Sequence, residues 1–275
     1  MSRWIVAVIS ALLITVAVNA QKLELGLWGG MALYSGDLSP KEVGLYFQEL
    51  EPAGGIFLRI NPVNAFSVRL GLSLTQLDAE DGVSNDFTDR MLNFRTTITE
   101  VSLTGEWNLF RLGNPRRTQV APYLYGGAGF FRFNPEARLD GQWVELQPLG
   151  TEGQGLPGYE DPYSLTQVQL PFGGGLKFII KKNITIGLEM GGRKLFTDHL
   201  DDVSSAQVNY LDVLTGNGPL AAQLSNPNIK EPENDVSYRR GGEKKDWYYM
   251  GGVTFSFRFG DGDGVQSRGL GCPTF

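Results

Sequence analysis

Apolar and polar residues alternate along most of the chain after residue 21, and this period of two is the period of a β-strand. In "AFSVRLGLSLT", Phe66, Val68 and Leu70 would face one way, while Ser67 and Arg69 would face the other. Several such segments are about as long as the ~9–11 residues that a tilted strand needs to cross a bilayer. The alternation covers eight segments: 22–34, 54–60, 65–75, 97–109, 123–133, 167–180, 184–196 and 247–259.

The connections between these segments alternate between short and long. Only "NPVN" separates the second and third segments, only "KKN" separates the sixth and seventh, and "RLGNPRRTQ" separates the fourth and fifth. The other connections cover about 35–53, 76–96, 134–166 and 197–246, and they are rich in Gly, Pro, Asp and Asn. Short turns at one end and long loops at the other are typical of bacterial outer-membrane barrels. The sequence therefore predicts an all-β fold, an eight-stranded antiparallel up-and-down transmembrane β-barrel with long extracellular loops.

The two faces of the predicted strands differ in a way that favours a membrane. One face carries Leu, Ile, Val, Phe and Met, and the other carries Gly, Ser and Thr with charges of both signs. An Arg or Lys facing lipid at the bilayer midplane would cost about 2–4 kcal/mol. We expect the charges to pair inside a lumen that is too narrow to conduct. The nine expected interior charges are Glu24, Arg59, Arg69, Glu100, Glu106, Lys177, Glu189, Arg193 and Arg258.

A soluble sandwich or lipocalin-like barrel would alternate as well, but its apolar face would point inward and its outward face would be polar. The small and mutually compensating residues of the polar face fit a narrow barrel interior better.

The two ends of the chain predict its compartment. "MSRWIVAVISALLITVAVNA" has a cation, a short apolar run and small residues before position 21, which is the pattern of a secretory signal peptide. We expect residues 1–20 to be removed, residues 21–260 to form the barrel and residues 261–275 to form a flexible periplasmic tail. The closing strand ends on Phe259, an aromatic terminus that resembles the assembly signal of outer-membrane barrels. An even number of strands places both termini in the periplasm of a Gram-negative cell.

Charge and cysteine content exclude several classes of protein. The net charge of −6 becomes about −7 once Arg3 leaves with the signal peptide, which argues against a nucleic-acid partner. Cys272 is the single cysteine, so there is no internal disulfide framework. An odd cysteine in an exported chain is either a free thiol or a partner in an intermolecular disulfide. With one His and one Cys, the sequence predicts no zinc site, and it predicts no cofactor.

The longest loop opens with a motif that holds His199, the single histidine. One interpretation is a rim hydrolase with Asp–His or Ser–His machinery. Others are a partner surface, weak calcium binding, or a structural loop in which Thr197 or Asp198 caps a short helix. Because flanking aspartates arise readily by chance, we expect a structural loop and no enzyme. The motif consists of Phe196, Thr197, Asp198, His199, Leu200, Asp201, Asp202, Val203 and Ser204.

Taken together, "LELGLWGGMALYSGDL", "APYLYGGAGFFRFNP", "GGRKLFTDHLDDVSS" and "VTFSFRF" resemble the PorG group of small outer-membrane barrels of the Bacteroidetes type IX secretion system. The resemblance implies a non-enzymatic component that anchors a periplasmic ring of a PorK-like lipoprotein and a PorN-like protein to the outer membrane, in contact with outer-membrane lipid. It also implies that Cys272 could tether the tail to the ring through a disulfide. The alternatives are a rim hydrolase acting on lipid A or peptides, and a surface adhesin barrel of the small OmpA/OmpX type.

Overall fold

The computed structural model describes residues 23–39, 50–81, 90–181, 183–229, 236–242 and 245–259. The predicted signal peptide and the predicted tail, with Cys272, lie outside these residues. The strands and helices of the described chain are β1 (Leu23–Ser35), β2 (Glu51–Val63), β3 (Phe66–Glu80), β4 (Asn93–Asn108), β5 (Leu112–Gly113), β6 (Thr118–Arg132), β7 (Pro135–Leu139), β8 (Gln142–Glu145), η3 (Gln147–Leu149), β9 (Thr166–Ile180), β10 (Ile184–Leu195), β11 (Gln207–Asn209), α2 (Tyr210–Gly216), α3 (Pro219–Ser225), β12 (Ser237–Arg239) and β13 (Trp247–Arg258).

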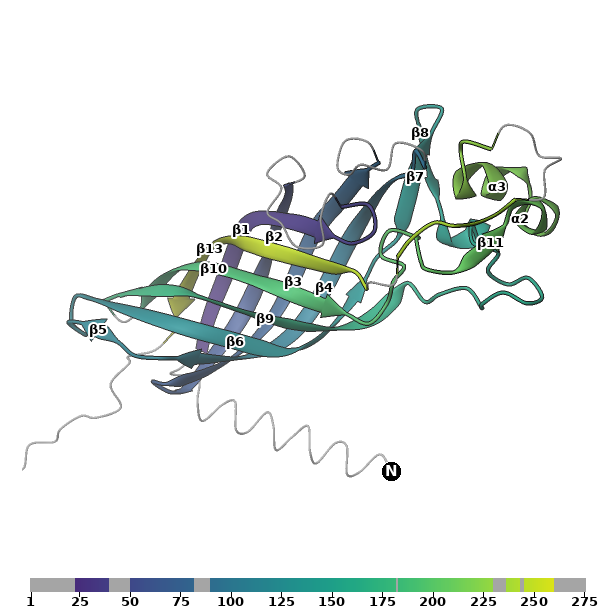
Figure 1. The fold of residues 1–275 in the computed structure, drawn as a ribbon. Coiled ribbons are helices and arrows are strands. Elements are labelled where there is room, and N and C mark those ends of the chain that lie inside the picture. The colour runs from purple at the N-terminus through teal and green to yellow at the C-terminus, as the bar shows by residue number, and fades with distance from the viewer. Residues whose placement is uncertain are drawn as a thin grey trace, which may run out of the picture.

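Eight long strands form a closed antiparallel barrel, which confirms the predicted fold class (Figure 1). Each strand pairs with the next long strand along the chain, and β4 pairs directly with β6. The barrel closes where β1 pairs with β13, from Glu24 opposite Arg258 to Ser35 opposite Trp247. None of the helices in the described chain is long and apolar enough to cross a bilayer.

The two ends of the barrel differ greatly in size (Figure 1). At the short-turn end lie the connections β2–β3, β4–β6 and β9–β10, with the small strand β5. At the opposite end, the loop end, the described parts of 134–165 and 196–246 fold into a loop cap. This cap contains the β7–β8 hairpin, the β11–β12 ribbon and the helices α2 and α3.

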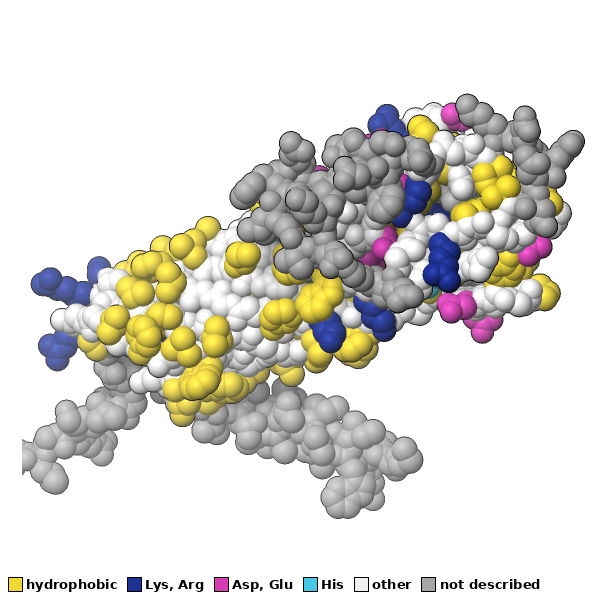
Figure 2. Space-filling model, in the orientation of Figure 1, with side chains coloured by type: hydrophobic (Ala, Val, Ile, Leu, Met, Phe, Trp, Pro, Cys, Tyr) yellow, Lys and Arg dark blue, Asp and Glu magenta, His cyan; other side chains and the backbone are white. Residues whose placement is uncertain are grey.

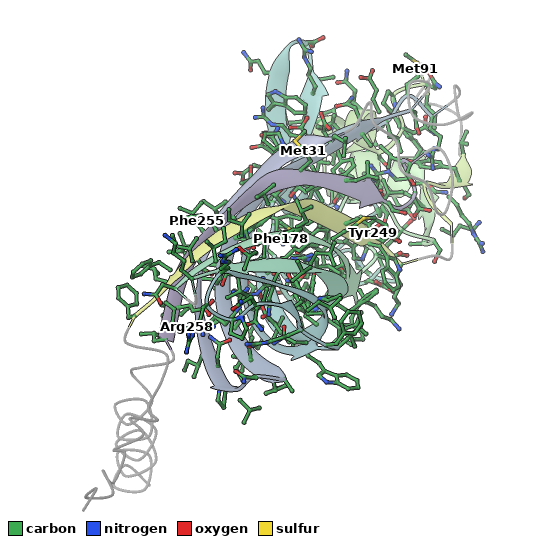
Figure 3. The ribbon with its side chains drawn as sticks, turned by 90° about the vertical axis from the view of Figure 1, so that its left-hand side faces the viewer. Met31, Met91, Phe178, Tyr249, Phe255 and Arg258 are labelled. Atoms are coloured by element: carbon green, nitrogen blue, oxygen red, sulfur yellow. The ribbon has the colours of Figure 1, made fainter. Side chains whose placement is uncertain are left out.

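The outer wall carries an apolar band. Leu27, Met31, Leu103 and Phe255 are examples of apolar side chains that remain between 40% and 57% exposed. Hydrophobic side chains are spread over the barrel wall in Figure 2, and Figure 3 labels Met31 and Phe255 among them. An exposed apolar wall around a polar interior is the reverse of a soluble barrel, so the fold is of the outer-membrane type.

Strands β3 and β4 continue several residues beyond this band, and there the pattern inverts. On β3, Leu70, Leu72 and Leu74 face outward, but the next outward positions are polar, and Leu77 and Ala79 face inward. On β4 the inward residues change along the strand from Glu106 and Glu100 to Ile98 and Phe94 in the same way. The sequence pattern predicts a loop over 76–96, and this prediction is wrong at both ends of that range. The strands instead run to residue 80 and restart at residue 93, because the side chains alternate there with the opposite polarity.

Candidate functional site: the filled lumen and the loop cap

The lumen nearest the short-turn end is filled by a group of paired charges. Arg59 donates to Glu24 at 3.0 Å and to Glu106 at 3.2 Å, while Lys177 Nζ lies 2.5 Å from Glu106. Arg258 donates to the other oxygen of Glu24 at 2.6 Å. Glu24, Arg59 and Glu106 are each at most 2% exposed. The carboxylates of Glu24 and Glu106 therefore each have two or more cations around them, and the charges of this group lie inside the barrel.

Two further ion pairs continue the filling toward the loop end. Arg69 binds Glu189 through two hydrogen bonds of 2.6 and 3.1 Å, and its Nε lies 3.3 Å from Glu106. Nearer the loop end, Arg193 donates to Glu100 at 3.2 Å. The structure thus places all nine expected charges inside the barrel and joins them as ion pairs. Two spaces that open among them measure about 20 and about 10 Å³, each about enough for one water molecule.

Above the charges, the barrel is closed a second time by an apolar plug. Leu200 and Val203, from the predicted loop motif, insert into it and are at most 1% exposed. Phe131 stacks on Phe133 with ring centroids 5.4 Å apart. The motif thus ties the loop cap onto the barrel. The plug consists of Ala32, Tyr34, Leu38, Ala53, Leu77, Ala79, Leu92, Phe94, Ile98, Phe131, Phe133, Leu195, Leu200, Val203, Tyr248 and Met250.

Two buried aspartates join the plug to the strands. The Tyr34 hydroxyl lies 2.6 Å from Asp201 and 3.2 Å from Asp246, while the backbone N–H of Leu200 donates to Asp246 and that of Val203 to Asp201. Burial, together with the charges of neighbouring carboxylates, raises the pKa of both aspartates well above the usual value. A hydroxyl has one proton, so a second proton held by one of the carboxyls would complete both bonds.

The other half of the motif holds the two long loops to each other. Asp202 accepts from Tyr163 at 2.7 Å and from Arg240 at 3.2 Å. Ser204 donates its backbone N–H and its hydroxyl to the buried carboxylate of Glu152, at 2.8 and 2.6 Å. Burial raises the pKa of Glu152 to about 7, against the opposing effect of Arg240.

His199 has the surroundings of a packed ring. It stacks on Tyr163 with centroids 4.6 Å apart, and its buried Nδ1 has no hydrogen-bond partner. The hydroxyl of Ser204 is taken by Glu152. Desolvation lowers the pKa of His199, which favours the neutral ring. The structure therefore does not bring Ser204 and His199 together as a nucleophile and its base.

The remaining motif residues mark its entry. Phe196 is exposed on the outside, and its carbonyl accepts from Lys245. Thr197 Oγ1 accepts from the backbone N–H of His199, but no helix follows, so the alternative that Thr197 or Asp198 caps a short helix is wrong. Burial and the charge of Asp37 raise the pKa of Asp198 to about 6. Within the described residues, no set of three or more His, Cys, Asp or Glu side chains is arranged to hold a metal ion.

Phe259, the expected terminal aromatic, directly follows β13. Its N–H donates to the carbonyl of Leu23 at 2.9 Å, and its exposed ring packs against Phe257 with centroids 5.5 Å apart. The end of the closing strand thus remains hydrogen-bonded to the first strand at the short-turn end.

Several residues of the site were not predicted from the sequence. Tyr123 donates to Glu189 at 2.6 Å and Tyr248 to Glu100 at 2.9 Å, and the alternation of their strands would have placed both inside. Glu152, Arg240 and Asp246 lie in irregular loops, where no periodic signal identifies a buried charge.

Comparison with solved structures gives small barrels of low similarity. Neisserial surface protein A is 10% identical with a TM-score of 0.40, and covers 86% of this chain and 97% of its own. Ail, the attachment invasion locus protein of Yersinia pestis, is 13% identical with a TM-score of 0.36, at 86% and 98% coverage. The N-terminal β-barrel domain of Pseudomonas aeruginosa OprF is 14% identical with a TM-score of 0.34, also at 86% and 98%.

A search among curated proteins gives no match. A family model described as "Domain of unknown function (DUF6089)" matches residues 3–221, which is more than half of the chain. The chain therefore belongs to the DUF6089 family.

Proposed function

We propose that this barrel is a non-enzymatic outer-membrane component of a type IX protein secretion machinery, similar to the PorG group. It would anchor a periplasmic ring, built from a PorK-like lipoprotein and a PorN-like protein, to the outer membrane. The short-turn end and both termini would then face the periplasm. The apolar band supports the place in the membrane, and the filled lumen supports an anchor over a conduit.

The observation that carries this proposal is the charge of the short-turn end. Arg116, Arg117 and Lys181 are exposed there, and Arg111 is half-buried. The β4–β6 and β9–β10 connections lie side by side, since the N–H of Lys181 donates to the carbonyl of Arg117 at 2.8 Å. The three short connections, 63–66, 108–118 and 180–184, contain no Asp or Glu, although the whole chain carries a net charge of −6. Figure 2 shows Lys and Arg side chains gathered at this end of the barrel.

A cationic tip that projects from the apolar band is a surface for an acidic partner. Complementary charge steers association and fixes orientation more than it adds affinity. An acidic patch on a ring protein would dock here, at the end where the chain also leaves the barrel. We name this surface, formed by Arg111, Arg116, Arg117 and Lys181, the basic end.

Charge reversal tests this docking. Arg116→Glu with Arg117→Glu should sharply reduce the ring proteins recovered with the barrel after crosslinking in detergent-solubilised outer membrane. Arg132→Glu with Arg138→Glu is the matched control, because both arginines are exposed at the loop end. The proposal fails if the ring proteins are absent from the wild-type sample, or if both double variants recover them equally.

Cys272 would add a covalent tether to the same contact. It lies outside the described residues, so the tether rests on the sequence alone. Non-reducing gels of membranes should show a band of higher mass that disappears in Cys272→Ser. A wild-type protein that runs only at its monomer mass, with normal secretion in the variant, would exclude the tether and leave the charge-based docking to be judged by its own test.

A surface adhesin is a second candidate, and one observation favours it. The β7–β8 hairpin presents Trp143, 38% exposed, with the guanidinium of Arg95 4.0 Å from its ring centroid. An exposed aromatic on a folded hairpin suits contact with an external partner. Deletion of the hairpin turn should abolish adhesion in this case and leave secretion unchanged.

The rim hydrolase has less support, because His199 and Ser204 have separate partners. We expect His199→Ala to leave secretion intact. Loss of a lipid A or peptide hydrolysis activity in this variant would favour the hydrolase instead.

A further inference from the structure

The loop cap contains a pocket of about 330 Å³ that no part of the proposed anchor uses. It lies between the turns of 150–160 and the segment that follows the loop motif, and its lining includes Glu152, Gln154, Tyr159, Glu160, His199 and Gln207. This volume is many times that of the two spaces among the lumen charges, and it is enough for an amino-acid side chain or a small amine.

One wall of this pocket depends on a glycine with a left-handed backbone conformation. Gly153 has φ of +82°, a conformation that L residues rarely adopt. A Cβ at this position would lie 2.5 Å from the ring of Tyr159. The Tyr159 hydroxyl is in turn fixed, since it donates to Asp212 at 2.7 Å. A side chain at position 153 would therefore displace the ring that lines the pocket.

The base of the pocket is a buried carboxylate. Glu152 is 3% exposed and accepts two hydrogen bonds from Ser204. Its nearest cation, Arg240, has Nη1 3.7 Å away, and this atom is closer to Asp202, at 3.2 Å. Arg240 therefore neutralises Glu152 only in part.

Two of the remaining polar groups of the pocket, Glu160 and His199, offer acceptors, and the side-chain amides of Gln154 and Gln207 offer donors as well as acceptors. Glu160 is exposed at the mouth, and its carboxylate makes no ion pair within the described residues. His199 is half-buried beside it, and its neutral ring has one acceptor nitrogen. Among the described residues that line the pocket there is no Lys or Arg. Two carboxylates without a lining cation favour a ligand that supplies hydrogen-bond donors and positive charge.

We propose that this pocket binds an organic cation, the guanidinium or ammonium group of a small amine or of a basic side chain. Glu160 meets the cation at the mouth, and Glu152 and His199 accept from it at the base. The carboxylates bind the cation through charge-assisted hydrogen bonds, while Tyr159 packs against its apolar stem. This site is independent of the proposed anchoring role, because it lies at the opposite end of the barrel.

Calorimetric titration of the full-length barrel in detergent micelles tests the pocket. The probes are agmatine, as a free amine, and the blocked peptide acetyl-Gly-Arg-Gly-amide, as a protein side chain. The same peptide with citrulline in place of Arg is the neutral control of equal shape. Binding of agmatine alone assigns a free amine, and binding of the Arg peptide assigns a side chain. No binding of either probe, or equal binding of the citrulline peptide, overturns the proposal.

Two variants locate the binding. Glu160→Gln, at an exposed position, should weaken the bound probe about tenfold or more, because a charge-assisted hydrogen bond is lost. Asp161→Asn removes the same charge one residue away, at an exposed position outside the lining, and should change the affinity little. Equal weakening by both variants would mean that the cation responds only to the overall negative charge of this surface, and it would overturn the proposed site.

A proton count gives a separate readout. Glu152 is partly protonated near neutral pH, so an arriving cation should displace its proton. Titrations in buffers of different ionisation enthalpy should show proton release in the wild type and much less in Glu152→Gln. Binding that releases no proton in the wild type would contradict a contact with Glu152. If Glu152→Gln does not fold, the pair of Glu160 and Asp161 variants still decides.

Discussion

At the scale of single residues, the lumen depends on pairs of buried charges. Arg193 and Glu100 form such a pair, and both are at most 5% exposed. Removing both charges restores a neutral interior, whereas removing one leaves a buried charge that has lost its counter-ion. The second situation costs more free energy of unfolding, because the remaining charge can neither reach water nor find another cation nearby.

We predict that Arg193→Met lowers the free energy of unfolding by about 3–5 kcal/mol. The double variant Arg193→Met with Glu100→Leu should lose clearly less. Urea-induced unfolding in lipid vesicles, followed by tryptophan fluorescence, gives both values. A double variant that is less stable than the single one would show that the pair itself stabilises the barrel.

The sequence indicates which residues face the lumen, because side chains alternate with a period of two wherever a strand is continuous. It does not indicate which charges pair. Arg69 meets Glu189 across the lumen, 120 residues along the chain, and this contact depends on the barrel's closure and tilt. Alternation shows whether a side chain points into or out of the barrel. Its ion-pair partner depends on how the strands are arranged around the closed barrel.

At the scale of strands and loops, the loop-end parts of β3 and β4 were not predicted from the sequence. Beyond the apolar band, the inward side chains become apolar and the outward ones polar, as in a soluble sheet. A strand predicted from outward-facing apolar residues therefore stops at the edge of the apolar band, several residues before the real strand ends. The helices α2 and α3 have seven residues each, and their apolar side chains form a small cluster with Val208. Helices this short are stabilised by packing, so the sequence gives little sign of them.

The loop cap should lose stability as the pH rises. The folded pKa of Glu152 is about 7, above the value of 4.5 expected when unfolded, so the folded cap binds this proton more tightly. The stabilisation from the proton is complete below about pH 4.5 and is lost as the pH rises through about 7. The difference between these values corresponds to about 3 kcal/mol.

We predict that Glu152→Gln, which keeps the shape of the protonated acid, reduces this pH dependence. Hydrogen exchange of cap amides, such as the N–H of Ser204, measures it at pH 5 and pH 8. The wild type should exchange faster at pH 8 after correction for the intrinsic rate, and the variant should show a smaller difference. Asp201 and Asp246 hold raised pKa values in the same cap, so part of the dependence should persist.

At the scale of the whole molecule, the barrel is closed by two different materials, paired charges below and an apolar plug above. We predict that purified protein in a planar bilayer shows no large, steady conductance. Loosening the plug alone, with Leu200→Gly, should not open a path, because the charged groups still fill the lumen. Steady conductance in the wild type would contradict a filled lumen.

The same two-ended design predicts the orientation in the membrane. In a Cys272→Ser background, a cysteine in place of Gln142, exposed on the β7–β8 hairpin, should react with a membrane-impermeant maleimide in intact cells. A cysteine in place of Arg116, exposed at the basic end, should react only after the outer membrane is opened. The reverse result would place the basic end outside and remove the basis for docking a periplasmic ring.

The double closure of the lumen also imposes an order of events in time. The cap contacts the first strand through Asp201 and Tyr34, and it is attached to the last strand through Asp246. In the proposed outer membrane, a folded cap is too large to pass through a lumen that paired charges and an apolar plug fill. The long loops must therefore cross the membrane before β1 pairs with β13. Pairing of these two strands becomes the last step of assembly, and a chain in which they pair too early would leave its own loops in the periplasm.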